Sequence, residues 1–448
     1  MHPTHNIRGT CIIMGASIAG ILAARALSTH FEKILIIERD RLPEAPECRK
    51  GTAQGHHAHI LLRRGLLGLE QMFPGYTLNL LDAGAVMTNA SRDWYNLFPM
   101  GAFPNFESDY EFICASRPLI EHTLRHTLLQ QCGNITITDQ SNVTRISLSQ
   151  DQPAQITVQN KDASKADMTA DLLVDASGRN SHTPNLLQQQ GFGTVPETLV
   201  KPWLGYATRL YSSVSMPTSV KATVVMAKDP DMTRGGVLFP IENNQYICTL
   251  YGFSSDYPAT DEMGFMHYAS SLRSDVIYSA IKPAQPLTDA KAFIKDESRY
   301  RHYATQQNWP QGFLVIGDAV CSFNPIYGQG ITASVLAAEA LKKFVTHNMS
   351  AEANWARRAQ RKIVQSYRAA WTISTSEDLR WPKTEGAKSG ILLGIMHRFS
   401  NWIGKAACAD QHIAFAYIKV LHMTATPLAL LTPVVLLRML MSVFRKKT

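Results

Sequence analysis

Two glycine-rich segments, far apart in the sequence, carry the residue types that bind phosphorylated ligands. The first is GASIAG, residues 15–20, which follows the apolar run TCIIM and precedes ILAARAL. Small residues let the backbone approach a pyrophosphate, and the helix that follows offers amide donors and positive potential. Glu38 stands 18 residues after Gly20, at the end of ILII, where a carboxylate accepts a ribose hydroxyl. A dinucleotide site is therefore predicted, with these contacts: Gly15, Ser17, Ile18, Ala19, Gly20, Glu38 and Arg39.

The second segment is VIGDAVCSFNPIYGQGI, residues 315–331. Asp318 follows an apolar run and could accept a bond from a ligand hydroxyl, while Pro325 stiffens the turn. Gly328 and Gly330 would present bare amides at the start of a helix expected from Ile331 to about residue 344, and such a terminus stabilises negative charge. A simple turn with an aspartate cap would explain Asp318 but not the whole spacing.

The elements that must position these segments follow from hydrophobic patterning. Strand, turn, helix and strand are expected over 10–40, short strands separated by turns over 134–175, and strands with a final helical stretch over 200–290. A second strand-turn-helix is expected at 313–344, followed by a mostly helical region. At 448 residues and 49.8 kDa, with 45% hydrophobic and 18% charged residues, the chain should form two or three globular domains.

The two segments together resemble the flavin enzymes of the p-hydroxybenzoate hydroxylase-like fold, whose late motif has the form GDAxxxxxPxxGxG. LLVDASGRNSHTP (172–184) resembles the middle motif of that family more loosely, because Ala-Ser is inserted before Gly178. Arg117, in ASRPLIEHTLR, stands where the family often has an arginine that opens a helix toward FAD; a solvated arginine at a helix start is the alternative. The resemblance implies non-covalent FAD, held by Arg117, Asp175, Asp318, Gly328, Gly330 and Ile331.

The resemblance also implies an α/β fold with three regions. They are an FAD-binding Rossmann-like domain of the glutathione-reductase type (1–80, 107–184 and 295–345), an inserted β-sheet substrate domain (81–106 and 185–294), and a helical C-terminal region (346–448).

The stretch RKGTAQGHHAHILLRRG (49–65) is similar to a segment of bacterial FAD-dependent epoxidases that act on polyene precursors of polyethers. In that family the loop passes near the flavin ring, which makes Arg49, Gln54 and His57 candidates to touch it, together with Pro325. His56, His57 and His59 could suggest a metal, but no matching carboxylate or cysteine partners stand out. We therefore expect flavin-edge or packing roles for these histidines and no metal.

The function implied is that of a monooxygenase, in which a flavin C4a-hydroperoxide delivers one oxygen of O2 to an electron-rich, lipophilic substrate. Epoxidation of a polyene or isoprenoid in secondary metabolism is favoured. The alternatives are an aromatic hydroxylase, a prenyl double-bond reductase and a non-enzymatic flavoprotein. No acid-base constellation is found, and alkene epoxidation needs none. The reductant is NAD(P)H or a reduced flavin from a partner reductase. LGYATRLY (204–211) and GGVLFPI (235–241) are the expected walls of an apolar substrate cavity.

The cysteines, the net charge and one apolar segment indicate where the protein is located and what it binds. Seven scattered cysteines without a CxxC pair, and an N-terminus without an apolar h-region, predict a cytoplasmic protein. The net charge of +8 comes without a nucleic-acid-binding motif, so nucleic acid is not an expected partner. The apolar segment 424–444 is interrupted by Pro427, Pro433 and Arg438, which disfavours a membrane span. It should be either a helix packed on the protein or a peripheral membrane element within 424–448, with RKK (445–447) on anionic headgroups.

Overall fold

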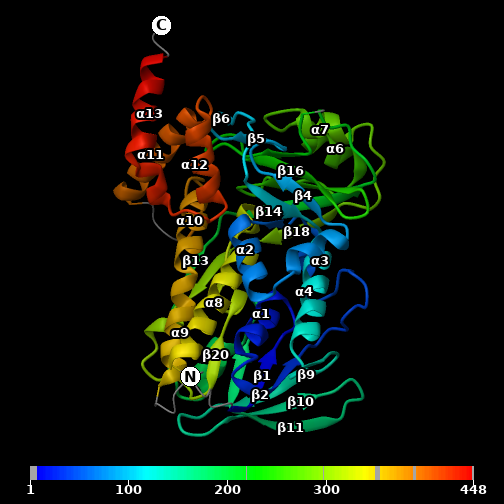
Figure 1. The fold of residues 1–448 in the computed structure, drawn as a ribbon, viewed down its shortest axis with the longest axis vertical. Helices are drawn as coiled ribbons and strands as arrows, with labels where there is room; N and C mark the ends of the chain where they lie inside the picture. The colour runs from blue at the N-terminus through cyan, green and yellow to red at the C-terminus, as the bar shows by residue number, and fades with distance from the viewer. Residues whose placement is uncertain (1–7, 218, 296, 349–353, 387–389, 446–448) are drawn as a thin grey trace.

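The computed structural model describes residues 8–217, 219–295, 297–348, 354–386 and 390–445. A parallel sheet of five strands occupies the lower half of the molecule in Figure 1. Its central strands are continuous apolar runs; Ile12, Ile13, Ile34 and Ile36 are fully buried, as expected for a parallel sheet covered on both faces. The strands, in spatial order, are β20 (Phe313–Val315), β12 (Leu172–Asp175), β1 (Arg8–Met14), β2 (Phe31–Ile37) and β8 (Ile135–Thr138).

Helices and a small antiparallel sheet enclose this core. The predicted unit β1-α1-β2 is present, and α1 (Ile18–Leu27) contacts both α4 (Arg117–Gln131) and α8 (Gly330–Asn348). The three-stranded antiparallel sheet lies at the bottom of Figure 1 and contacts β1 through β11. Its strands are β9 (Asn142–Ser147), β10 (Ala154–Gln159) and β11 (Lys165–Ala170). The predicted α/β class with a Rossmann-like core is confirmed.

Strand β20 lies at one edge of the parallel sheet, where helix α9 (Trp355–Ser366) packs beside it. The side-chain amide of Gln360 is fully buried against this edge. Its Oε1 accepts a hydrogen bond from the Val315 N–H at 2.8 Å, and its Nε2 donates to the Val315 carbonyl at 3.0 Å. The amide thus pairs with the strand as a neighbouring strand would.

A second, seven-stranded sheet fills the upper half of Figure 1. Helices α6 (Glu262–Ser270) and α7 (Val276–Ile281) pack on it around the buried side chains of Leu238, Leu250 and Phe265. The strands, in spatial order, are β18 (Lys291–Lys295), β14 (Leu204–Tyr211), β17 (Gln245–Gly252), β16 (Arg234–Ile241), β15 (Ala222–Val225), β5 (Trp94–Phe98) and β6 (Gly101–Ala102). This sheet therefore draws its strands from 94–102 and 204–295.

Smaller elements connect the two large sheets. One is the sheet of β3 (Ile60–Leu61), β7 (Glu111–Cys114) and β4 (Val86–Asn89), and another is that of β13 (Glu197–Val200), β19 (Ser298–Arg301) and β21 (Cys321–Ser322). The remaining helices before the C-terminal region are α2 (Arg63–Met72), α3 (Tyr76–Asp82) and α5 (Thr183–Gln189).

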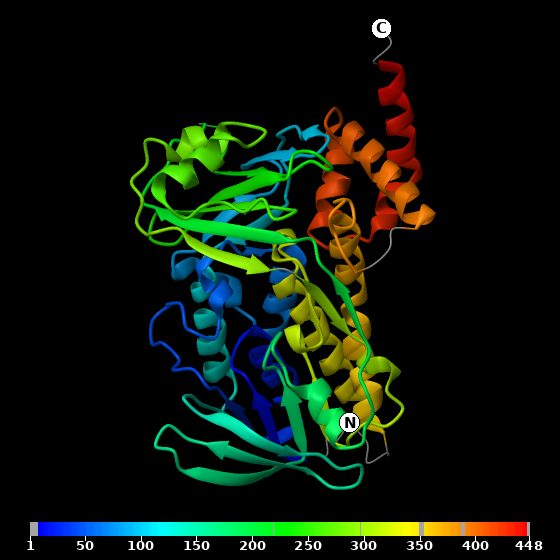
Figure 2. The ribbon, with the colours of Figure 1, turned by 180° about the vertical axis from the view of Figure 1, so that it is seen from behind.

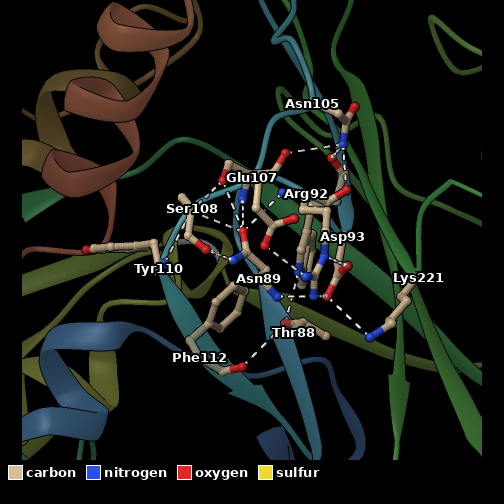
Figure 3. Close-up of polar contacts among 12 residues, drawn as sticks. Thr88, Asn89, Arg92, Asp93, Asn105, Glu107, Ser108, Tyr110, Phe112 and Lys221 are labelled. Atoms are coloured by element: carbon tan, nitrogen blue, oxygen red, sulfur yellow. Dashed lines mark hydrogen bonds and ion pairs between the residues drawn. The ribbon is translucent and has the colours of Figure 1, made fainter.

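The chain crosses between sheets through a polar turn that joins β4 to β5 (Figure 3). Asp93 accepts hydrogen bonds from the Asn89 N–H at 2.9 Å and from Arg92 at 2.7 Å, and its carboxylate lies 3.3 Å from Lys221. Although partial burial opposes the charge, these partners lower the pKa of Asp93 to about 2. Because the carboxylate is fully engaged, we interpret this cluster as a structural connection.

The C-terminal region is helical, as predicted. It consists of α9, α10 (Arg368–Asp378), α11 (Ile391–Ala407), α12 (Gln411–Leu421) and α13 (Pro433–Arg445). Figures 1 and 2 show α11, α12 and α13 gathered at one end of the molecule, opposite β9–β11. None of the helices in the described ranges is long and apolar enough to cross a bilayer.

Candidate functional site

A cavity of about 860 Å³ lies where the two glycine-rich segments meet. The first segment follows β1 and the second follows β20, and β12 lies between β1 and β20 in the sheet. Carboxyl ends of parallel strands meet at one edge, which brings distant residues together. Fifteen of the predicted site residues line the cavity: Gly15, Ser17, Ile18, Ala19, Glu38, Arg39, Arg49, Gln54, Arg117, Asp175, Asp318, Pro325, Gly328, Gly330 and Ile331.

Two predicted residues, Gly20 and His57, are not among the lining residues. Gly20 has a packing role instead, since a Cβ there would stand 1.9 Å from the carbonyl oxygen of Gly15. Gly15 itself has a φ of +104° and packs against the turn after β12, where a Cβ would meet the Ala176 carbonyl at 2.6 Å. These two glycines are thus required for α1 to start tightly against the sheet.

The carboxylate of Glu38 holds the turn after β1. Its Oε2 accepts from the Ala16 N–H at 2.8 Å, and its Oε1 accepts from the Asp40 N–H at 3.0 Å. Arg49 lies 3.2 Å from Glu38 and 2.9 Å from both Asp40 and Glu121. Burial opposes the charge of Arg49, but the three carboxylates raise its pKa. Arg49 therefore lies beside the Gly15 turn, and its contact with a flavin ring stays a prediction.

Arg117 is the second cation of this cluster. It begins α4 behind the cap Ser116, whose hydroxyl accepts from the Leu119 N–H. Its Nη2 donates to the Ser17 hydroxyl at 2.9 Å and to Glu121 at 3.1 Å. The side chain is only 15% exposed, so it is not the solvated arginine of the alternative interpretation. Its buried Nε has no hydrogen-bond partner within the described residues.

Asp175 and Asp318 follow neighbouring strands but have different environments. Asp175 is 1% exposed and accepts from the N–H and hydroxyl of Ser177 and from the hydroxyls of Ser181 and Thr183. It therefore shapes the loop over 176–183. Asp318 lines the cavity, and no hydrogen bond to its carboxylate is found in the described part of the chain. Asp318 is thus the carboxylate left available for a ligand hydroxyl.

The turn over 324–330 is braced from the C-terminal region. The carboxylate of Asp378, at the end of α10, accepts from the Asn324 side chain at 2.7 Å and from the Tyr327 hydroxyl at 3.1 Å. Gly328 adopts a φ of +66°, which allows the turn to enter α8. A Cβ at Gly330 would meet no atom within 4 Å, so this position faces open space at the cavity wall.

The histidines of GHHAH separate into different environments. His57 is buried beside Tyr206 and Phe293, with Nδ1 2.8 Å from the Thr208 hydroxyl. His59 lines the cavity, and its Nδ1 must donate to the His57 carbonyl, which can only accept, at 2.9 Å. Burial lowers the pKa of His57 to about 4 and that of His59 to about 3, so both rings are neutral at neutral pH.

Several lining residues were not among the predicted contacts. Arg179 and His182 lie in the segment 172–184, which the middle motif marked without singling them out as contacts. Val143, Thr144 and Arg145 of β9 and Phe293 of the seven-stranded sheet depend on strands that meet only in the fold, and no local motif marks them. No residue of β14 or β16 lines this cavity, so the expected role of LGYATRLY and GGVLFPI as walls of a substrate cavity stays a prediction.

The cavity fits a dinucleotide flavin. The starts of α1 and α8 supply amide donors, Arg117 offers an unpaired buried N–H for a phosphate, and Asp318 offers an acceptor for a hydroxyl. Open space at Gly330 allows a planar ring to approach that helix start. Over the same described ranges, no group of three or more His, Cys, Asp or Glu side chains could hold a metal ion.

Known proteins share this architecture. No family model matches the chain. Protein Rv3254 of Mycobacterium tuberculosis is 29% identical over 390 residues, which cover 84% of this chain and 81% of that protein.

Solved structures are more distant in sequence. A flavoprotein/dehydrogenase from Cytophaga hutchinsonii has a TM-score of 0.65 at 17% identity, with 92% of each chain covered. The flavin-dependent brominase Bmp2 has a TM-score of 0.64 at 13% identity, covering 98% of this chain and 99% of its own. The p-nitrophenol 4-monooxygenase PnpA from Pseudomonas putida has a TM-score of 0.63 at 14% identity, covering 92% and 96%. The chain therefore has the fold of these flavoproteins, which is the p-hydroxybenzoate hydroxylase-like fold.

Proposed function

We propose that this chain binds FAD and is a flavin-dependent monooxygenase. The observation that carries the proposal is the convergence on one cavity of two helix starts, the Arg117 Nε–H and the Asp318 carboxylate, neither of which has a hydrogen-bond partner among the described residues. Structural neighbours named as a flavoprotein, a brominase and a p-nitrophenol monooxygenase support a flavin cofactor. Bound FAD would supply the activation of O2 once it is reduced by NAD(P)H or by a flavin reductase.

The residues of the chain would then bind, orient and exclude water. Arg117 and the amides at the start of α1 would hold the pyrophosphate, Asp318 would hold a hydroxyl of the ribityl chain, and the start of α8 would stabilise negative charge on the reduced ring. Asp378 fixes the turn over 324–330 through Asn324 and Tyr327, so this turn would offer a bound flavin a rigid wall. The ring of His59, which lines the cavity, is neutral at neutral pH, so the positive potential there comes from the helix starts and from Arg117.

The substrate class is proposed to be lipophilic and electron-rich, with alkene epoxidation as the reaction. Aromatic and apolar side chains from four segments gather between the second sheet, the 324–330 turn and the end of α10. They are Leu204, Tyr206, Ala227, Tyr251, Phe253 and Trp381, with Phe293 and Ile326 packed against them. Transfer of oxygen to an alkene requires contact and alignment and no protein base, and the lining residues include no carboxylate pair suited to general acid-base work.

Product analysis tests the proposal. The purified protein should release a yellow flavin on mild denaturation and, with NAD(P)H or a flavin reductase, should oxygenate members of a panel of polyenes and phenols. Incorporation of oxygen from isotopically labelled O2 gas is the required outcome. Turnover without O2 that saturates a double bond would identify a reductase, and a hydroxylated phenol would identify an aromatic hydroxylase. Flavin that stays inert toward O2 and every substrate would identify a non-enzymatic flavoprotein.

A further inference from the structure

We propose that helices α11 and α13 together form a docking surface for an anionic membrane. Large apolar side chains on these helices face solvent, which is costly for a monomeric protein unless something covers them. On α11, Ile391, Leu392 and Ile395 are 89%, 70% and 56% exposed. On α13, Val434, Leu437 and Leu440 are 64%, 60% and 50% exposed. We call these six residues the α11/α13 face.

The face follows helical periodicity and does not result from loose packing. Residues 391, 392 and 395 share one side of α11, and residues 434, 437 and 440 share one side of α13. The two helices are in contact with each other. They lie at the end of the molecule where Figures 1 and 2 both show the C-terminal helices.

The opposite sides of both helices are already fixed to the protein. His397 of α11 donates to the Ser376 carbonyl at 2.8 Å, and Asn401 accepts from Arg380 at 2.9 Å. Val435 and Met439 of α13 are buried, and Arg438 forms an ion pair with Asp410 at 2.9 Å. Within the segment 424–448, which was predicted to be either packed or membrane-bound, the inner side of α13 is thus packed on the protein. The exposed apolar side of α13 continues onto α11, which lies outside 424–448.

The positive charge around the α11/α13 face indicates that its partner is an anionic membrane. Residues 391–448 contain seven of the 44 Lys and Arg residues but one of the 36 Asp and Glu residues, so this part carries +6 of the net charge of +8. Arg398 and Lys405 are exposed on α11 itself. An amphipathic, basic surface is suited to the interface of a membrane with anionic headgroups. A second copy of the chain would instead bring these like charges together.

We expect the α11/α13 face to bind at the membrane interface, with its apolar side chains at the level of the headgroups and acyl chains. No helix in the described ranges is long and apolar enough to span the bilayer. The last residues, 446–448, lie outside the described part of the chain, and only their charge enters the argument.

Co-sedimentation with vesicles tests the proposal without reference to activity. Wild-type protein should bind vesicles of phosphatidylcholine with phosphatidylserine more tightly than vesicles of phosphatidylcholine alone. The combined change Ile391→Gln, Leu392→Gln and Ile395→Gln should lower binding by about tenfold or more, because apolar burial is lost. The matched control is Leu78→Gln, Met263→Gln and Ile294→Gln, which alters side chains that are 64%, 83% and 58% exposed elsewhere and should bind as wild type does.

A second variant tests the contribution of charge. Arg398→Gln with Lys405→Gln should reduce binding to the anionic vesicles and leave the weaker binding to phosphatidylcholine unchanged. Three results would overturn the proposal. They are wild-type protein that binds neither vesicle, equal loss of binding in the α11 variant and its matched control, and a wild-type dimer in size-exclusion chromatography that the α11 variant converts to monomer. The last result would assign the face to self-association.

Discussion

The contrast between Asp175 and Asp318 allows ligand binding to be separated from stability. Asp318 takes no hydrogen bond from the described residues, so Asp318→Ala leaves no protein donor unsatisfied. Loss of the Asp318 carboxylate should therefore weaken FAD binding and leave the stability of the FAD-free protein unchanged. A hydrogen bond to a charged group contributes about 1.5–3 kcal/mol, which corresponds to a rise of about 10- to 150-fold in the dissociation constant for FAD.

Asp175→Ala, at the end of the adjacent strand, should instead lower the stability of the protein before FAD is added. Four hydrogen bonds from Ser177, Ser181 and Thr183 lose their acceptor in a buried site. Each unsatisfied buried group costs about 1–3 kcal/mol, so the FAD-free protein should lose at least about 3 kcal/mol of stability.

Two measurements are needed on FAD-free protein: the melting temperature, and a titration with FAD followed by flavin fluorescence. Asp318→Ala should melt as wild type does and bind FAD more weakly, while Asp175→Ala should melt at a lower temperature before any FAD is added. The reasoning fails if Asp318→Ala destabilises the FAD-free protein as much as Asp175→Ala does, or if its affinity for FAD is unchanged.

Further predictions concern the glycines, Arg117 and a buried histidine. Gly330→Ala should fold normally and bind FAD poorly, because its Cβ enters open space at the cavity, whereas Gly20→Ala should yield misfolded protein by circular dichroism because of the 1.9 Å approach to a backbone oxygen. Arg117→Gln should weaken FAD binding by about tenfold or more in equilibrium dialysis, and Arg117→Lys should restore part of it; equal affinity in all three proteins would remove the phosphate contact. His57 has a folded pKa of about 4, below its ordinary value of 6.5, so the stability that its neutral ring contributes is present above pH 6.5 and is lost as pH falls toward 4. The loss, about 3 kcal/mol, should show as a pH-dependent urea midpoint that flattens in His57→Gln; an unchanged slope would contradict a buried neutral ring.

Local patterns predicted the parts of the site that depend on local backbone geometry. The turn after β1, the Asp318 turn and the start of α8 each lie within a few residues of sequence, where glycines and strand ends leave a clear mark. The same reasoning could not choose among the histidines of GHHAH. A 3-10 turn (Ala53–His56) ends just before His57, so neither strand nor helix periodicity indicates which ring reaches the cavity.

Long-range pairings account for most of what sequence alone did not reveal. Nothing in the sequence connects Arg49 with Glu121, 72 positions away, or places β9 at the cavity. The prediction that β14 and β16 wall a substrate cavity stays a prediction, because the cavity assigned to FAD is not lined by either strand. Leu204 and Tyr206 of β14 belong instead to the hydrophobic cluster proposed to meet the substrate. The apolar segment after Thr424 was recognised, but its division into a packed side and an exposed side depends on where α11 and α12 lie.

The pairing of Gln360 with Val315 has a consequence for solubility. An open strand edge offers a template to which another polypeptide can add, and this is a common start of aggregation. By occupying both the donor and the acceptor of Val315, one buried amide satisfies the outer edge of β20 beneath α9, where the sheet ends. The substitution Gln360→Leu would fill similar space and keep the helix. It would, however, leave the N–H and carbonyl of Val315 unpaired and able to bond a strand of another molecule during folding. Less soluble protein should then be recovered from refolding at high concentration than with the wild-type amide, although α9 would still cover the edge once folded.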